Sequence, residues 1–331
     1  MGYFFHQGPV NYLNSINGEN FDVIALELFR YQYEHNRVYK SFVDALSVQP
    51  GAVTDITAIP FLPAGFFKTH DVITGAAEDD CTVFRSSTTT SDIPARHIIK
   101  DIALYDTSLL YGFRQFYGDP SEYVFLALLP SYLQREGASL VYMVQKLMEQ
   151  SGNDMNGFYL DEHEQLFHVL NRLEATGQKY MLIGVTFGLL DFAERYNMKL
   201  SGGVVMETGG MKGRRKEMTR DEVHTILKER LGVAQVHSEY GMTELLSQAY
   251  AKKEGIFSPA PAMKVLARDQ NDPLELNRSG TGNLNIIDLA NVYSCAFIAT
   301  DDIGRIYDDG SFEVLGRSDN SALRGCNLMV L

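Results

Sequence analysis

The pattern of apolar and polar residues changes along this 331-residue chain. Over residues 21–46, apolar side chains recur at the three- and four-residue spacing of an amphipathic helix. Residues 59–72 contain two prolines and indicate extended chain. We therefore expect a helical region to precede the main body of the protein.

From residue 82 onward, short apolar runs alternate with amphipathic segments. The runs predict strands at residues 82–86, 123–130, 179–186, 202–210 and 233–238. The segments between them predict helices at residues 95–118, 135–150, 162–177, 189–197 and 219–232. This alternation is typical of an α/β fold with a mainly parallel sheet flanked by helices.

After about residue 262 the pattern changes to short strands separated by turn residues such as Asp309 and Gly310. Such spacing predicts a smaller antiparallel β region near the C-terminus. We therefore divide the chain into residues 1–261, a helical lead-in with an α/β core, and residues 262–331, a small β subdomain.

Composition narrows the classes of partner. The 29 lysines and arginines are outnumbered by 42 acidic residues, and the formal net charge is −13. This acidic balance argues against nucleic acid and anionic membranes as partners. The N-terminus lacks the features of a signal peptide, and the most apolar stretch, residues 180–193, is too short to span a bilayer. Three cysteines, an odd and low number, fit the reducing cytoplasm.

Four stretches carry candidate chemistry: FRSSTTTSD, ETGGMKG, HSEYGMTELLSQAYA and ATDDIGRIYDDGSFEVLGRSD. In this order and at these distances they resemble motifs of the adenylate-forming acyl ligase superfamily. Within it, LLPSYLQREGASLVYMV and RGCNL are most similar to the LuxE-type acyl-protein synthetases. The resemblance runs from about Ile59 to the C-terminus and implies the N-terminal fold of these ligases.

The resemblance implies a reaction that uses ATP and Mg²⁺. A carboxylate is a poor electrophile, and its transfer to the α-phosphate of ATP makes a mixed anhydride with a good leaving group. The protein must then neutralise the triphosphate and align the carboxylate oxygen with the phosphorus. A small carboxylic acid, in our interpretation a fatty acid, is the substrate.

The hydroxyl run from Ser86 to Ser91 lies where the family places its phosphate loop. The residues that would contact phosphate are Ser86, Ser87, Thr88, Thr89 and Thr90. Thr88 and Ser91 stand where the family has glycines, and threonine does not share the conformational freedom of glycine. The alternative is a polar turn that caps a helix starting near Pro94.

The YGMTE stretch follows a predicted strand and, by its sequence, precedes a helix. The resemblance places Tyr240 against adenine, Gly241 and Met242 beside the nucleotide, Thr243 on phosphate and Glu244 on Mg²⁺. A carboxylate suits this hard ion. The alternative is that Thr243 and Glu244 form an ordinary first turn of a helix.

Two further stretches complete the nucleotide site implied by the resemblance. Gly209, Gly210 and Met211 would let adenine lie against the backbone, unless they form a simple strand-to-loop turn. Asp302 matches the aspartate that binds ribose hydroxyls, for which a carboxylate is a suitable acceptor. Arg317 lies at the hinge that leads into the family's C-terminal lid.

The family's lid carries a lysine, and the twelve residues after Asp319 contain none. On this resemblance, we expect the chain to lack most of the lid. These residues include Cys326, which the resemblance makes the acyl acceptor, since a thiolate is a strong nucleophile. Otherwise Cys326 is an inert, packed residue.

We expect an acyl-protein synthetase that forms an acyl-adenylate and transfers the acyl group to Cys326. It would pass this group to a reductase or transferase subunit. One alternative is an acyl-CoA ligase of the phenylacetate-ligase type. The other is a degenerate subunit that binds a nucleotide or acyl group without catalysis.

Overall fold

A computed structural model describes residues 9–76, 80–86, 93–129, 137–209 and 218–318 of the chain. Most of its strands form one sheet, whose order is β12-β11-β13-β14-β15-β10-β9-β8-β7-β6-β4-β5. A thirteenth strand, β1 (Leu62–Pro63), pairs with β14 outside this path. No described helix is both long and apolar enough to cross a membrane.

One end of the sheet is parallel, as the sequence predicts. Its strands are β5 (Gly157–Phe158), β4 (Val124–Leu128), β6 (Tyr180–Val185), β7 (Gly203–Thr208) and β8 (Val236–Tyr240). All five residues of β4 are buried, which explains its uninterrupted apolar sequence.

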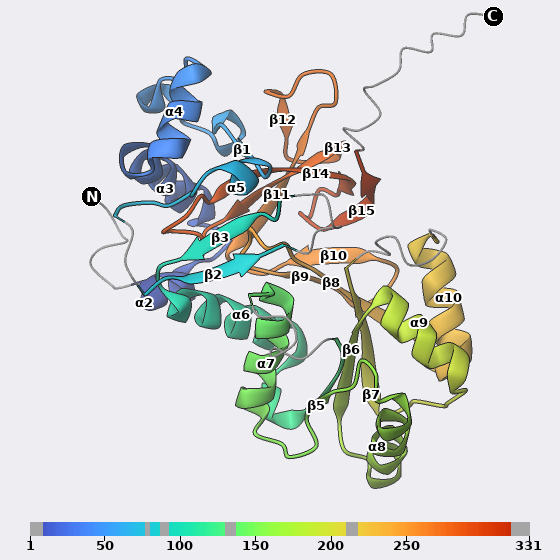
Figure 1. Cartoon of the computed structure of the whole chain (residues 1–331). Coiled ribbons are helices and arrows are strands. Elements are labelled where there is room, and N and C mark those ends of the chain that lie inside the picture. The colour runs from blue at the N-terminus through green and yellow to red at the C-terminus, as the bar shows by residue number, and fades with distance from the viewer. Residues whose placement is uncertain (1–8, 77–79, 87–92, 130–136, 210–217, 319–331) are drawn as a thin grey trace, which may run out of the picture.

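Helices cover both faces of the parallel strands, in agreement with the expected fold class (Figure 1). Phe125 and Ala127 of β4 pack in the same core as α6 (Ile102–Tyr117) and α7 (Ser139–Ser151). The alternate β4 residues face the second core, formed with α8 (His163–Thr176), α9 (Thr186–Arg195) and α10 (Arg220–Leu231).

The remaining strands form the antiparallel part of the sheet. They are β9 (Ala249–Ala251), β10 (Ile256–Pro259), β11 (Met263–Arg268), β12 (Leu276–Asn277), β13 (Gly280–Asp288), β14 (Phe297–Ile306) and β15 (Phe312–Arg317). β9 and β10 precede residue 262, so antiparallel pairing starts earlier than expected. β10 also pairs with β15, so the sheet crosses the predicted boundary between residues 261 and 262. The division of the chain at this boundary stays a prediction.

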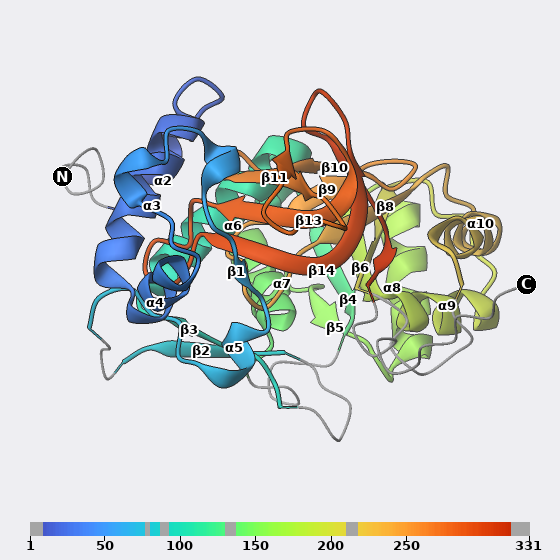
Figure 2. The same ribbon diagram turned by 90° about the horizontal axis from the view of Figure 1, so that it is seen from above.

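The predicted N-terminal helical region is present and packs beside the antiparallel strands (Figure 2). Its helices are α2 (Pro9–Ser15), α3 (Phe21–His35) and α4 (Arg37–Ala45). Short elements follow: η1 (Pro50–Ala52), η2 (Ile56–Ala58) and α5 (Phe66–Thr69), with η3 (Pro120–Glu122) later in the chain.

The hydroxyl-rich run connects two strands, and the expectation of one helix over residues 95–118 is wrong in its first part. β2 (Thr82–Arg85) pairs antiparallel with β3 (Arg96–Ile99), and α6 begins only after Asp101 caps its first turn. The two buried residues of β3, His97 and Ile99, alternate with partly exposed neighbours, which is the two-residue period of a strand. The turn therefore does not cap a helix near Pro94.

The predicted start of α10 is a capping box. The Thr219 backbone N–H donates to Glu222 Oε2 at 2.7 Å, and the Glu222 N–H donates to Thr219 Oγ1 at 3.3 Å. We expect Thr219→Ala to lower the free energy of unfolding by about 1 kcal/mol, because one helix N–H loses its acceptor. Urea unfolding would measure this loss. Thr219→Ser keeps the hydroxyl and serves as the control; equal midpoints for the two variants would contradict the prediction.

Candidate active site

Three neighbouring parallel strands end at one edge of the sheet. Val185 of β6 lies opposite Thr208 of β7, and Thr208 lies opposite Glu239 of β8. The next residues in each chain segment are Thr186, Gly209 and Tyr240. In open α/β sheets, ligands bind at the carboxyl ends of the strands, so this edge is the candidate active site.

Tyr240 joins two of the predicted motifs directly. Its hydroxyl donates to Asp302 Oδ2 at 2.8 Å, although the two residues are 62 positions apart. Phe257 and Phe312 pack edge-on against the Tyr240 ring, with centroid distances of 5.9 and 5.5 Å. Burial, followed by the charge of Asp302, raises the pKa of Tyr240. The phenol therefore remains a protonated donor at neutral pH.

Arg317 lies beside the same aspartate. Asp302 and Arg317 are opposite each other on β14 and β15, and Arg317 Nε is 3.8 Å from Asp302 Oδ1. Its guanidinium is also 4.0 Å from Asp301. The Arg317 side chain is 56% exposed, whereas that of Asp302 is 18% exposed. The Arg317 guanidinium is thus accessible to solvent, whereas the Asp302 carboxylate beside it is largely buried.

The YGMTE residues form a turn that leads to β9, and the expected helix after them is absent. A Cβ on Gly241 would lie 2.6 Å from Glu239 Oε1, so a larger residue there would require the Glu239 carboxylate to shift. Met242 and Thr243 are partly buried, and Glu244 is 7% exposed. Thr243 and Glu244 are therefore not the first turn of a helix.

Gly209 follows β7 in a left-handed conformation, with φ of +74°. This conformation favours glycine over other residues. The Gly209 carbonyl accepts a hydrogen bond of 2.8 Å from Thr186 Oγ1 at the start of α9. The turn thus links the ends of β6 and β7 at the candidate site.

Ser86 closes the β2–β3 hairpin. Its N–H donates to the Ala95 carbonyl at 3.0 Å, and its Oγ accepts from the Ala95 N–H at 2.9 Å. The other predicted residues of this loop, Ser87, Thr88, Thr89 and Thr90, lie outside the described residues. The same holds for three predicted site residues elsewhere: Gly210, Met211 and Cys326.

Sequence reasoning missed Glu239, which is buried beneath the candidate site. Thr208 Oγ1 donates a hydrogen bond to its carboxylate. Burial, with a contribution from the charge of Glu207, raises the pKa of Glu239 to about 7. The only sequence signal was its position immediately before Tyr240.

A second buried carboxylate, Glu207, is paired. Arg220 Nε lies 3.3 Å and His224 Nε2 lies 3.8 Å from Glu207 Oε1. Burial opposes ionisation of Glu207, but His224 and the charge of Arg220 outweigh it and lower the pKa. Arg220 also donates to the Val314 carbonyl at 3.3 Å, so this side chain connects α10 to both β7 and β15.

The oxygen donors at the site suit Mg²⁺ that is bound mainly through phosphate. Glu244 offers a carboxylate and Thr243 a hydroxyl. Among the residues that the structure describes, no group of three His, Cys, Asp or Glu side chains could hold a metal ion. Mg²⁺ is commonly held by one or two carboxylates together with substrate phosphates, and the donors present fit that arrangement.

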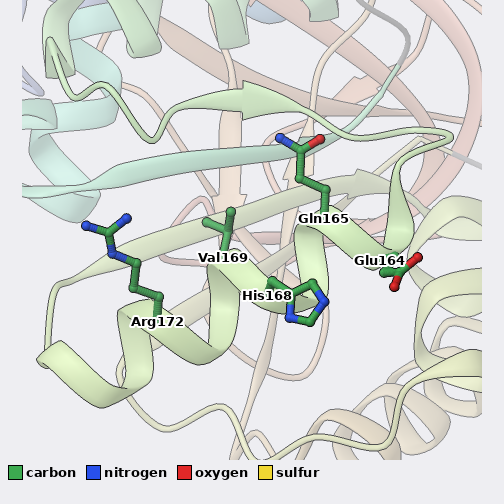
Figure 3. A pocket seen from close by; sticks show the side chains of 5 residues that line it. All are labelled: Glu164, Gln165, His168, Val169 and Arg172. Carbon is green, nitrogen blue, oxygen red and sulfur yellow. The ribbon is translucent and has the colours of Figure 1, made fainter.

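Neither a surface hollow on α8 nor the buried Cys295 belongs to this site. The hollow is lined by Glu164, Gln165, His168, Val169 and Arg172, all from α8 (Figure 3), and includes no predicted site residue. Cys295 is fully buried, and burial raises the pKa of its thiol to about 12. Cys295 is therefore a core residue, as its apolar surroundings in the sequence indicate.

Several solved structures share the fold. A 2-hydroxyisobutyryl-CoA ligase, in an open conformation with 2-HIB-AMP and CoA, aligns with a TM-score of 0.64 and 11% identity, over 90% of this chain and 74% of that one. The ATP-bound RpMatB-BxBclM chimera aligns with a TM-score of 0.54 and 18% identity, over 73% of this chain and 49% of the chimera. O-Succinylbenzoate-CoA synthetase from Bacillus subtilis, with ATP and a magnesium ion, aligns with a TM-score of 0.51 and 17% identity, over 72% of this chain and 51% of the synthetase.

These alignments confirm the expected fold, that of the N-terminal domain of adenylate-forming ligases. The aligned region covers about half the length of the chimera and of the O-succinylbenzoate-CoA synthetase, and about three quarters of the 2-hydroxyisobutyryl-CoA ligase. No family model matches the sequence, and no curated protein matches it. At these identities the likeness concerns the fold, and the finer resemblance to the LuxE type stays a prediction.

The raised pKa of Glu239 predicts a pH dependence of stability. Between the ordinary pKa of a glutamate and about 7, the folded protein keeps a proton that the unfolded chain has released. The wild type should therefore lose stability as the pH rises through this window and level off above it. Glu239→Gln should remove this loss, which amounts to about 3 kcal/mol.

Denaturant unfolding of both proteins from pH 5 to pH 8 would measure the difference. Glu229→Gln, at an exposed position on α10, is the matched control and should follow the wild type at each pH. Parallel curves for the wild type and Glu239→Gln would contradict the prediction.

Proposed function

We propose that the protein is a ligase that uses ATP and Mg²⁺ to activate a small carboxylic acid as its acyl-adenylate. The observation that carries this proposal is the hydrogen bond between Tyr240 and Asp302. It brings the YGMTE turn and the TDDIGR strand together beside the carboxyl edge of the sheet, and both have a nucleotide role in the resembled family.

In this proposal each side chain has a defined task. The carboxylate oxygen of the acid attacks the α-phosphorus of ATP while the bond to pyrophosphate breaks. Tyr240 orients Asp302, whose carboxylate oxygens can accept hydrogen bonds from the ribose hydroxyls. Arg317 adds positive charge beside it. Glu244 and Thr243 would help to hold Mg²⁺, which would neutralise charge on the triphosphate.

Gly209 suits a flat base, because a backbone without a Cβ permits close approach. Among the described residues, its chain neighbours aside, no atom lies within 4 Å of the position that a Cβ would take on Gly209. Adenine would lie there, along Gly209, Gly210 and Met211. The phosphates would face the hydroxyl-rich loop from Ser86 to Thr90, which follows β2.

We further propose that the thiol of Cys326 attacks the carbonyl of the fatty acyl-adenylate, so that a thioester forms while AMP leaves and the thiol proton is released. The acyl group then passes to a reductase or transferase subunit. Such chemistry suits the reducing cytoplasm. Transfer to coenzyme A is the second candidate, because a ligase of similar fold binds CoA in its solved structure. A subunit that binds nucleotide without catalysis would show neither transfer.

Glu244→Gln tests the proposed metal role. The substitution keeps the size of the buried side chain and removes its charge, so acid-dependent exchange of pyrophosphate into ATP should fall about 10- to 100-fold, as expected for loss of a charged interaction. Exchange assays over a panel of carboxylic acids, with circular dichroism as a folding check, would measure it.

Glu229→Gln is again the control, since it removes one negative charge from the exposed face of α10. Exchange by Glu244→Gln at the wild-type rate would remove Glu244 from the metal site. No exchange by the wild type with any acid would favour the non-catalytic alternative.

Cys326→Ser tests the acceptor. This variant should still form acyl-adenylate and release pyrophosphate, because the thiol acts only in the second step. It should carry no hydroxylamine-sensitive acyl label, whereas the wild type should carry one. Intact-protein mass spectrometry would follow the label, with Cys81→Ser as the matched control. Consumption of coenzyme A by a wild type that never becomes labelled would favour the CoA ligase.

A further inference from the structure

The turn from Gly241 to Gln248 is held by side chains from outside it. His97 Nδ1, on β3, lies 2.8 Å from the Thr243 carbonyl oxygen. Asn291 Nδ2, in the segment between β13 and β14, donates to the Glu244 carbonyl at 2.8 Å. Because a carbonyl oxygen only accepts, Nδ1 of His97 carries the proton. Two consecutive carbonyls of the proposed phosphate- and metal-binding turn are thus fixed by two separate elements.

Asp288 extends this support to the rest of the turn. Its carboxylate accepts from the N–H groups of Leu246 and Ser247 at 2.7 and 3.0 Å, and from Ser247 Oγ at 2.6 Å. The same carboxylate lies 3.4 Å from Asn291 Nδ2. His97, Asp288 and Asn291 are all fully buried, so water does not compete for these bonds.

The other polar atoms of His97 and Asn291 argue against a packing role. Among the described residues, His97 Nε2 and Asn291 Oδ1 are buried and make no well-formed hydrogen bond, although a contact with the Asn291 side chain acts to raise the pKa of His97. Both residues line the same small cavity with Leu246 and Ser294. Burying an unsatisfied polar atom destabilises a fold, and an apolar side chain would fill such a site at lower cost. The bonds to the two carbonyls are what these polar residues contribute here.

His97 is suited to act as a permanent donor. Burial lowers its pKa to about 4, in opposition to the interactions with the Thr243 carbonyl and the Asn291 side chain. The imidazole is therefore neutral at physiological pH, with its single proton held on Nδ1 by the carbonyl. The Phe67 ring packs edge-on against the imidazole at a centroid distance of 5.4 Å and limits its rotation.

We propose that His97 and Asn291 are positioning residues, which hold the backbone of Thr243 and Glu244 so that their side chains meet the phosphates and the metal ion of ATP·Mg²⁺. This inference rests on the proposed function of the turn. It also gives β3 a role, because His97 of this strand contacts the turn that is proposed to bind the metal ion.

Two substitutions at one position separate hydrogen bonding from packing. In His97→Asn the amide nitrogen takes the place of Nδ1 and can donate to the Thr243 carbonyl. In His97→Gln the amide lies one bond further out, near the position of Nε2, and this bond is lost. Both variants are uncharged and polar, so a difference between them reports on the bond itself.

The first measurement is amide hydrogen exchange over residues 241–248, without ligand. His97→Gln should exchange about tenfold faster than the wild type in this segment, and His97→Asn should stay within about twofold, because local opening follows the loss of one buried bond. The second measurement is the Mg²⁺ concentration that gives half-maximal pyrophosphate exchange. It should rise about tenfold in His97→Gln and remain close to the wild type in His97→Asn.

His163→Gln is the matched control, because His163 is a buried histidine on α8 with an unpartnered ring nitrogen among the described residues. It should alter neither readout. Asn291→Leu, which removes the donor to Glu244, gives an independent test if the His97 variants do not fold. It should speed exchange over residues 241–248 and raise the Mg²⁺ requirement.

The outcomes separate the two proposals. A wild type that exchanges pyrophosphate, with His97→Gln and His97→Asn alike in both readouts, overturns the positioning role and leaves the proposed function intact. A wild type that exchanges no pyrophosphate with any acid overturns the proposed function. Hydrogen exchange then still decides whether His97 holds the turn.

Discussion

The pairing of β10 with β15 is the constraint on which the site depends. It joins strands β11 to β15 to β10 and, through β9, to the parallel strands, with Ile256 opposite Glu313 and Phe257 opposite Phe312. The two phenylalanine rings stack at a centroid distance of 5.4 Å and both pack against Tyr240. Because Asp302 lies on β14, which pairs with β15, this junction brings Asp302 within hydrogen-bonding distance of Tyr240. Tyr240 and Asp302 therefore meet because one sheet runs without a break from β8 to β14.

Two buried carboxylates at the ends of β7 and β8, Glu207 and Glu239, differ in protonation. Glu207 is ionised beside Arg220 and His224, whereas Glu239 has one hydroxyl donor and a pKa near neutrality. A buried carboxylate without a cationic partner tends to keep its proton. The ends of β7 and β8 thus carry one fixed negative charge and one group that titrates.

The sequence could predict the layers of the fold because β4 and its neighbours are uninterrupted apolar runs between amphipathic helices. It could also predict the start of α10, since Thr219 and Glu222 bond locally. It could not distinguish strand from helix at residues 96–99, where the pairing with β2 decides. The same holds for the turn after Tyr240, which is set by distant residues. His97, Asn291 and Glu239 were missed because their roles depend on contacts between elements far apart in sequence.

The ends of the sheet have a consequence for solubility during folding. The terminal strands along its path, β5 and β12, contain only two residues each. A long exposed edge would offer unpaired N–H and C=O groups to another chain, and very short edge strands limit this. The broad sheet can therefore extend over thirteen strands while offering little template for edge-to-edge aggregation.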